Sequence, residues 1–118
     1  MIKGIGIDLI ELDRIEQAIN RNERFPKRIL TELEYKAYLG LPNQTRQIEF
    51  LAGRFAAKEA FAKATTRGIG RLSFQDIMIL PSNSGAPSIK VNGYETENIF
   101  LSISHSRDYA VAQVIIEK

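Results

Sequence analysis

The distribution of apolar and polar positions predicts strands at both ends of the chain and helices between them. Residues 2–10 form an apolar run with the length and alternation of a buried strand. One face of this strand carries Ile5, Ile7 and Leu9, and the other carries Gly4, Gly6, Asp8 and Ile10. Because glycine has no side chain, another element can approach closely on the face of Asp8.

Capping signals predict helical segments after this strand. Asp13, with a glutamate three residues later, has the spacing of a capping box and predicts a helix ending near residues 20–22. Pro26 suits the first turn of a second helical piece. Thr31 is again followed by a glutamate at the capping distance, and Gly40 lies where that segment is expected to end.

The longest helix is expected from Thr45 to Thr66, with Gly68 as its stop. At ~100° per residue, one stripe of this helix is apolar except for Glu59 near its centre and Lys63 one turn later. The apolar members are Ile48, Leu51, Ala52, Phe55, Ala56 and Ala62. A different sector carries Arg54 and Lys58, and the opposite side carries Phe50, Ala57 and Phe61. A helix with two apolar sides is expected to be central, or to pack on both the core and a partner subunit.

The second half of the chain has the pattern of strands. The predicted strands are residues 72–80, 88–91, 100–105 and 109–116, joined by a loop at 82–87, a tight turn at Asn92-Gly93 and a hairpin turn at 106–108. Helices in the middle, with strands at the start and in the second half, predict an α+β fold. Residues 1–118 are expected to form one domain.

Composition limits the possible classes of protein. The chain has no cysteine, which excludes disulfides and thiolate metal sites, and one histidine, which excludes a multi-histidine zinc site within one chain. The net charge of +2 permits an anionic ligand but does not require nucleic acid. There is no signal-peptide pattern at the N-terminus and no apolar run of membrane-spanning length, so a cytoplasmic location without membrane contact is expected.

Asp8 and Glu59 are the strongest candidates for chemistry, because each is an acid on an otherwise apolar element. A buried carboxylate must be neutral, paired or bound to a metal, since burying a lone charge is very costly. Mg²⁺ takes one or two carboxylates and completes its shell with water and substrate phosphates. Lys58, Lys63 and Arg54 are then candidates to receive phosphate oxygens. Structural explanations stay open: backbone amides or an arginine can satisfy Asp8, and Glu59 can pair with Lys63.

The other candidates are His105 and an arginine-rich helical face. His105 ends the alternation of a strand, where it either makes a structural hydrogen bond or contacts a ligand. At helical spacing, one face carries Arg14, Ala18, Arg21, Phe25 and Arg28. This face is either simply solvated or a docking surface for an acidic helix, with Phe25 as an exposed apolar anchor in a charged rim.

Three segments of the sequence resemble the 4′-phosphopantetheinyl transferases. Residues 55–63 (FAAKEAFAK) are similar to the family's aromatic-x-x-Lys-Glu-x-x-x-Lys motif. The segment GIGIDLIELDRI resembles the family's N-terminal motif, whose aspartate corresponds to Asp8. The chain length and the closing SISHS…YAVAQV are similar to the small bacterial members, the holo-[acyl-carrier-protein] synthases.

The resemblance implies a fold in which the long helix packs on an antiparallel sheet, and a reaction that supports fatty acid biosynthesis. 4′-Phosphopantetheine would move from coenzyme A to a serine of apo acyl carrier protein, with release of adenosine 3′,5′-bisphosphate. The resemblance also implies a Mg²⁺ ion held by Asp8 and Glu59, and homotrimers with active sites between subunits.

The chemistry of the implied reaction leads to further expected roles. Glu59 or a magnesium-bound water would remove the serine proton, and Lys58 and Lys63 would stabilise charge on phosphoryl oxygens. The expected coenzyme-binding residues are Arg46, Arg54, Lys58, Lys63, Gly85, Pro87 and His105. The expected carrier-protein face is Arg14, Ala18, Arg21, Arg24, Phe25 and Arg28.

Two other functions are compatible with parts of this pattern. A basic nucleic-acid-binding module would carry exposed aromatic and basic residues on its strands. The strands here have few basic residues, and that reading leaves the buried acids unexplained. A relative that has lost activity is the other possibility, against which the intact Lys58–Glu59–Lys63 set argues.

Overall fold

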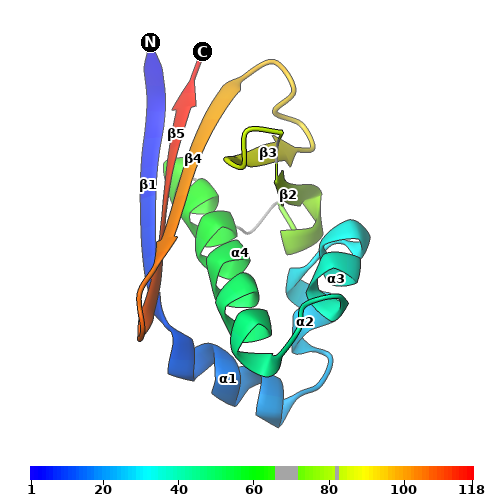
Figure 1. Cartoon of the computed structure of the whole chain (residues 1–118). Helices are drawn as coiled ribbons and strands as arrows, with labels where there is room; N and C mark the ends of the chain where they lie inside the picture. The colour runs from blue at the N-terminus through cyan, green and yellow to red at the C-terminus, as the bar shows by residue number, and fades with distance from the viewer. Residues whose placement is uncertain (66–71, 82) are drawn as a thin grey trace.

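The structure, a computed structural model, describes residues 1–65, 72–81 and 83–118. Figure 1 shows a long helix, α4, at the centre, with a three-stranded sheet on one side and α2, α3 and a two-stranded sheet on the other, while α1 runs across the bottom. The elements are β1 (Ile2–Glu11), α1 (Leu12–Arg21), α2 (Phe25–Ile29), α3 (Glu32–Leu39), α4 (Gln44–Ala64), the 3-10 turn η2 (Phe74–Asp76), β2 (Ile77–Pro81), β3 (Pro87–Val91), β4 (Asn98–His105) and β5 (Tyr109–Glu117). The predicted α+β fold, with a long helix packed on an antiparallel sheet, is confirmed.

The three-stranded sheet has the order β1–β5–β4, so the first and last strands of the chain are neighbours. All pairs are antiparallel, and the register places Asp8 opposite Ala112 and Leu9 opposite Val111. The hairpin between β4 and β5 turns at residues 106–108, as the sequence predicts, and the Ser106 N–H donates to the Tyr109 carbonyl at 2.8 Å. β2 and β3 form a separate two-stranded sheet. Asp8 therefore lies on an edge strand of the larger sheet, on the face that meets α4.

Both apolar sides of α4 are covered within the chain. Phe61 belongs to a core cluster with residues from both sheets, such as Ile79 and Val114. Leu51 belongs to a second cluster with Ile15 of α1 and residues of the other short helices. The helix is central, as one of the two expectations had it, although Phe50 and Phe55 stay half-buried. No helix in the described parts of the chain combines the length and apolarity needed to cross a membrane.

The outer face of the three-stranded sheet leaves apolar surface open to solvent. Ile5, Ile7 and Leu9 are 56%, 58% and 63% exposed, although they alternate with the residues of β1 that pack on α4. The prediction that residues 2–10 form a buried strand is thus correct for one face only.

The two glycines of β1 set the distance between strand and helix. A Cβ atom on Gly4 would lie 1.9 Å from the Ala64 carbonyl oxygen, and one on Gly6 would lie 1.9 Å from that of Ala60. No side chain fits in either place, because real contacts of this kind are about 3.5–4.0 Å. The element that glycine allows to approach the Asp8 face is therefore α4 itself.

Most short-range signals are confirmed, with differences at element ends. Thr31 makes the predicted capping box at the start of α3, and Gly93 adopts φ +91° in the predicted turn. α1 begins at Leu12 without a side-chain cap, so Asp13 is not its N-cap. The reason is tertiary: the Leu12 N–H donates to the Asp108 carbonyl at 2.9 Å, which satisfies the helix start from the neighbouring hairpin.

The starts of β2 and α4 also differ from the sequence prediction. The segment predicted as a strand from residue 72 is a 3-10 turn at Phe74–Asp76, and β2 starts only at Ile77. α4 begins at Gln44, with Asn43 as its cap. The predicted end at Thr66 and the stop at Gly68 lie outside the described residues.

Candidate active site

The structure brings Asp8, Glu59 and Lys63 together where β1 crosses α4. Lys63 Nζ lies 2.9 Å from Asp8 Oδ1 and 3.3 Å from the Ile7 carbonyl oxygen, to both of which it donates. Glu59 precedes Lys63 by one helical turn and is half-buried. The Asp8 side chain is 15% exposed and that of Lys63 56% exposed, so the cluster is open to solvent on the lysine side.

The electrostatics of this cluster favour a cation. Burial raises the pKa of Glu59, the negative charge of Asp8 raises this pKa further, and the charge of Lys63 opposes both effects. Two carboxylates that repel each other in this way gain from a divalent ion between them.

A magnesium ion fits these donors. Mg²⁺ prefers oxygen ligands and takes only one or two carboxylates from a protein. The described residues hold no group of three or more histidine, cysteine, aspartate or glutamate side chains that could bind a metal. The donors present at Asp8 and Glu59 therefore match a site completed by water and substrate oxygens.

Lys58 is not where the sequence pattern placed it. Its side chain has no exposed surface, whereas the Glu59 side chain is only half-buried. Lys58 Nζ donates to Glu34 Oε1 at 2.6 Å, to the Ile29 carbonyl at 2.8 Å and to the Phe74 carbonyl at 3.0 Å. Glu59 is buried only in part, and the fully buried charge of this helix is Lys58. Because α4 is apolar on many sides, the sequence pattern did not define which charged residue faces inward.

Glu34 is the buried partner of Lys58 that the sequence pattern missed. It was expected only as the capping partner of Thr31, and its Oε1 does accept from the Thr31 N–H at 2.7 Å. The same carboxylate is fully buried, pairs with Lys58, and accepts from the Ile79 N–H at 2.8 Å. Burial lowers the pKa of Lys58, and the charge of Glu34 works against that shift. The sequence did contain one general signal for such a residue. A lysine on a helix that is apolar on most sides requires a buried acid as its partner.

Three of the expected coenzyme-binding residues lie on or beside α4: Arg46 and Arg54 belong to this helix, and His105 is the last residue of β4. Arg46 Nε is 3.6 Å from Glu49 Oε1, and His105 Nδ1 is 3.8 Å from Glu49 Oε2. The Arg54 guanidinium stacks 4.1 Å above the Phe50 ring. Its Nε is buried and has no hydrogen-bond partner within the described residues, and burial lowers the pKa of this arginine.

The other two expected coenzyme-binding residues lie in or next to the two-stranded sheet. Gly85 is exposed, with φ +86°, in the connection between β2 and β3, and Pro87 begins β3. Asp8, by contrast, lies in the three-stranded sheet. The predicted coenzyme residues therefore come from separate parts of the fold.

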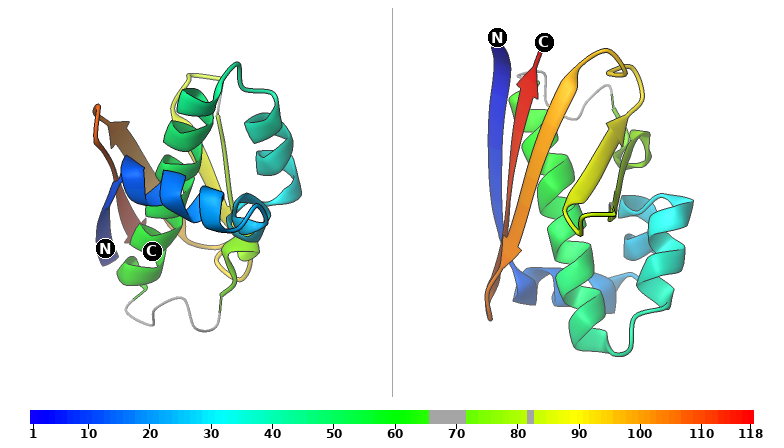
Figure 2. Two further views of the ribbon diagram at one scale, coloured as in Figure 1. Left: turned by 90° about the horizontal axis from the view of Figure 1, so that it is seen from below. Right: turned by 45° about the horizontal axis from the view of Figure 1, so that its top comes forward.

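The predicted carrier-protein face is carried by α1 and α2, and α1 lies across the end of the molecule where α4 begins, as the right view of Figure 2 shows. It is built by two helices, because α1 ends at Arg21 and α2 begins at Phe25. The four arginines of this face are exposed and Ala18 is half-buried. Phe25 is also half-buried, since its ring packs against Phe55 at a centroid distance of 6.2 Å. The expected exposed anchor is therefore corrected to a half-buried ring.

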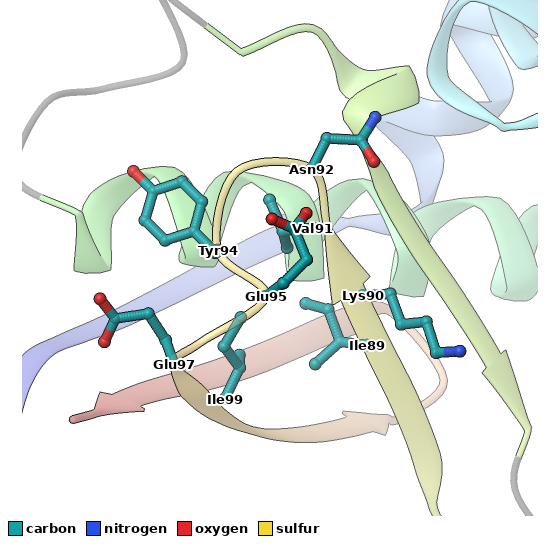
Figure 3. A pocket seen from close by; sticks show the side chains of 8 residues that line it. All are labelled: Ile89, Lys90, Val91, Asn92, Tyr94, Glu95, Glu97 and Ile99. Carbon is teal, nitrogen blue, oxygen red and sulfur yellow. The ribbon is translucent and has the colours of Figure 1, made fainter.

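A pocket of about 420 Å³ lies elsewhere, beside β3 and the loop that leads to β4 (Figure 3). Its lining includes the apolar side chains of Ile89 and Ile99, with Lys90, Glu95 and Glu97 among the charged ones. None of the residues of the Asp8 cluster lines it.

Comparisons with known proteins define the family. A profile of the 4′-phosphopantetheinyl transferase superfamily matches residues 4–114. The chain belongs to this superfamily and is an enzyme of the phosphopantetheinyl transferase class.

Within the superfamily, the chain is similar to the holo-[acyl-carrier-protein] synthases. The relative from Oceanobacillus iheyensis is 57% identical over 117 residues, which cover 99% of this chain and 98% of the relative. The relative from Geobacillus kaustophilus is 60% identical over 119 aligned positions, which cover 100% of this chain and 91% of the relative. The crystal structure of the Bacillus anthracis synthase in complex with CoA (3′,5′-ADP) has a TM-score of 0.91 at 48% identity and covers 100% of this chain and 98% of that one.

Proposed function

We propose that residues 1–118 act as one domain that transfers 4′-phosphopantetheine from coenzyme A to a serine of apo acyl carrier protein, in support of fatty acid biosynthesis. Serine Oγ would attack the phosphorus that carries the pantetheine arm. The bond from this phosphorus to the bridging oxygen would break, and adenosine 3′,5′-bisphosphate would leave. The observation that carries this proposal is the Asp8–Glu59–Lys63 cluster, in a chain 48–60% identical to the synthases compared above.

Each residue of the cluster would have its own role in the reaction. Asp8 and Glu59 would hold Mg²⁺, which would neutralise charge that develops on the phosphate oxygens. Lys63 is exposed enough for its ammonium to reach a phosphate oxygen without leaving the neighbourhood of Asp8. Glu59, or a water bound to the Mg²⁺, would accept the serine proton.

Coenzyme A would be bound by residues beyond this cluster. Arg46, Arg54 and His105 offer positive charge and hydrogen-bond donors along α4 and at the end of β4. Gly85 and Pro87 would contact the coenzyme from the second sheet. Because these groups are spread over one small chain, we propose that neighbouring copies complete each site.

The outer face of the three-stranded sheet is the surface we propose for assembly into a homotrimer. Residues directly opposite in a sheet project to the same side, so Ile5, Ile115 and Phe100 form one row across the sheet. Leu9 and Val111 belong to another row of the same face. Exposed apolar rows of this kind favour an interface, because association removes them from water.

The test of the reaction is mass spectrometry of an apo acyl carrier protein incubated with this protein, coenzyme A and Mg²⁺. We expect a mass increase of one phosphopantetheine group that is abolished by EDTA. A carrier protein with alanine in place of its acceptor serine is the matched control. The absence of any increase with several apo carrier proteins would overturn the proposal.

A further inference from the structure

The pair of Lys58 and Glu34 links the helical layer of the fold to the active-site helix. Lys58 projects from α4 and binds the last residue of α2, the carboxylate of α3 and the 3-10 turn before β2. Glu34 extends this hydrogen-bond network to β2, because its second carboxylate oxygen accepts from the Ile79 N–H at 2.8 Å. One buried ion pair thus joins four elements to α4.

Lys58 has no donor left for a ligand. An ammonium group has three N–H donors, and three acceptors lie within 3.0 Å of Lys58 Nζ. Its side chain is 0% exposed, so a phosphate oxygen cannot reach it in this conformation. Lys63, the other lysine of the motif, is more than half exposed and lies at Asp8.

The position of Lys58 determines where its neighbour points. Consecutive residues of an α-helix are about 100° apart around the axis, because a turn holds 3.6 residues. With Lys58 fixed to the layer of α3 and β2, Glu59 is directed away from that layer and toward β1, close enough to Asp8 for the two charges to interact. The contacts of Gly4 and Gly6 with α4 set the distance between strand and helix, and the Lys58–Glu34 pair sets the rotation of the helix.

We propose that Lys58 and Glu34 are positioning residues that hold Glu59 against Asp8, and that Lys58 does not contact coenzyme A. This inference rests on the proposed function, in which Asp8 and Glu59 hold Mg²⁺. It assigns Lys58 a role different from the phosphate contact that the sequence motif implies.

The test uses K58M, E34Q and the double variant K58M/E34Q. Each single variant leaves one buried charge without its partner, whereas the double variant leaves none. We expect the midpoint of urea denaturation of the double variant to lie closer to the wild-type midpoint than the midpoint of K58M does. If K58M does not fold, the double variant serves alone for the binding measurements.

Measurements of Mg²⁺ and coenzyme A binding distinguish a positioning role of Lys58 from direct contact with the coenzyme. Removal of a group that supports a metal ligand typically lowers the metal affinity 10–100-fold. In K58M/E34Q we therefore expect the half-saturating Mg²⁺ concentration for transfer to rise by about 10–100-fold. We expect the Kd for coenzyme A measured by calorimetry in EDTA to stay at the wild-type value.

Two matched variants serve as controls. K63M removes a lysine that faces the cluster and should weaken coenzyme A binding in EDTA. E32Q removes an exposed carboxylate from the same helix as Glu34 and should change neither quantity.

Three outcomes would overturn the proposal. Weaker coenzyme A binding by K58M/E34Q in EDTA would show that Lys58 contacts the coenzyme. An unchanged Mg²⁺ requirement in a folded double variant would show that the pair has no positioning role. A wild-type protein that neither binds coenzyme A nor modifies a carrier protein would instead refute the proposed function, and this role with it.

Discussion

Lys63 donates a hydrogen bond of 2.9 Å to Asp8, although 55 positions of the sequence separate the two residues. The bond spans the contact between β1 and α4, where Gly4 and Gly6 let the strand approach the helix backbone. The geometry of the candidate active site therefore depends on packing between a strand and a helix that the sequence places far apart.

Replacing Gly6 by alanine should destabilise the protein and reduce activity. The new Cβ would lie 1.9 Å from the Ala60 carbonyl oxygen, so the strand must move away from α4 and carry Asp8 with it. Overpacking of this kind typically costs about 1–3 kcal/mol, which urea denaturation measures. Gly40→Ala is the matched control, because its nearest contacts are at 3.6 Å. Equal losses in the two variants would contradict this explanation.

Replacing Glu59 by glutamine should stop transfer and change the pH dependence of stability. Burial and Asp8 raise the pKa of Glu59 in the folded state. Its protonated form is therefore favoured by folding, and this contribution is full below the ordinary glutamate pKa and is lost as pH rises through the raised value. In EDTA, the stability of E59Q relative to wild type should be greater at neutral pH than at acid pH.

Urea denaturation at the two pH values measures this difference, with E23Q, which alters an exposed side chain, as the control for loss of a charge. Addition of Mg²⁺ should stabilise wild type but not E59Q, since a ligand stabilises only the state that binds it. A relative stability that does not change with pH would contradict the expected interaction of Glu59 with Asp8.

Replacing Leu9 by lysine should disrupt the proposed trimer. Leu9 is 63% exposed on the outer face of the three-stranded sheet, and a charge there would oppose burial of this face against another copy. Light scattering should give a trimer mass for wild type and a smaller mass for L9K. Leu39→Lys is the control, because Leu39 is similarly exposed, at 57%, but lies on α3. A monomer mass for active wild-type protein would exclude the assembly.

Charge reversal at Arg14 or Arg21 should raise the KM for carrier protein while the KM for coenzyme A stays nearly constant. Both side chains are exposed on α1, so they would act by long-range attraction to an acidic partner. Added salt should have the same effect on wild type, because exposed charges are screened over about 8–10 Å at physiological ionic strength.

Lys118→Glu is the control for this face, since it reverses an exposed charge at the end of the molecule opposite α1 (Figure 1). Equal increases in both KM values would assign the arginines to the active site or the subunit interface. No change in either value would leave a solvated basic face.

Local interactions explain why much of the fold could be predicted. The capping box of Thr31, the turn at Gly93 and the hairpin at residues 106–108 each depend on residues close in the sequence. The period of the apolar positions separated strands from helices, and the motif residues identified Asp8 and Glu59 before their proximity was known.

Tertiary structure decided which charges are buried and which apolar faces are open. α4 is apolar around most of its circumference, so its sequence did not show that Lys58 points inward and Glu59 toward β1. Glu34, the partner of Lys58, could be recognised only once α3 was packed against α4, because 24 positions separate the two residues. In the same way, alternation in β1 gave the two faces of the strand, but only the packing showed that Ile7 and Leu9 face outward. The sequence determined the elements through short-range interactions, whereas the orientation of each element depended on contacts between distant segments.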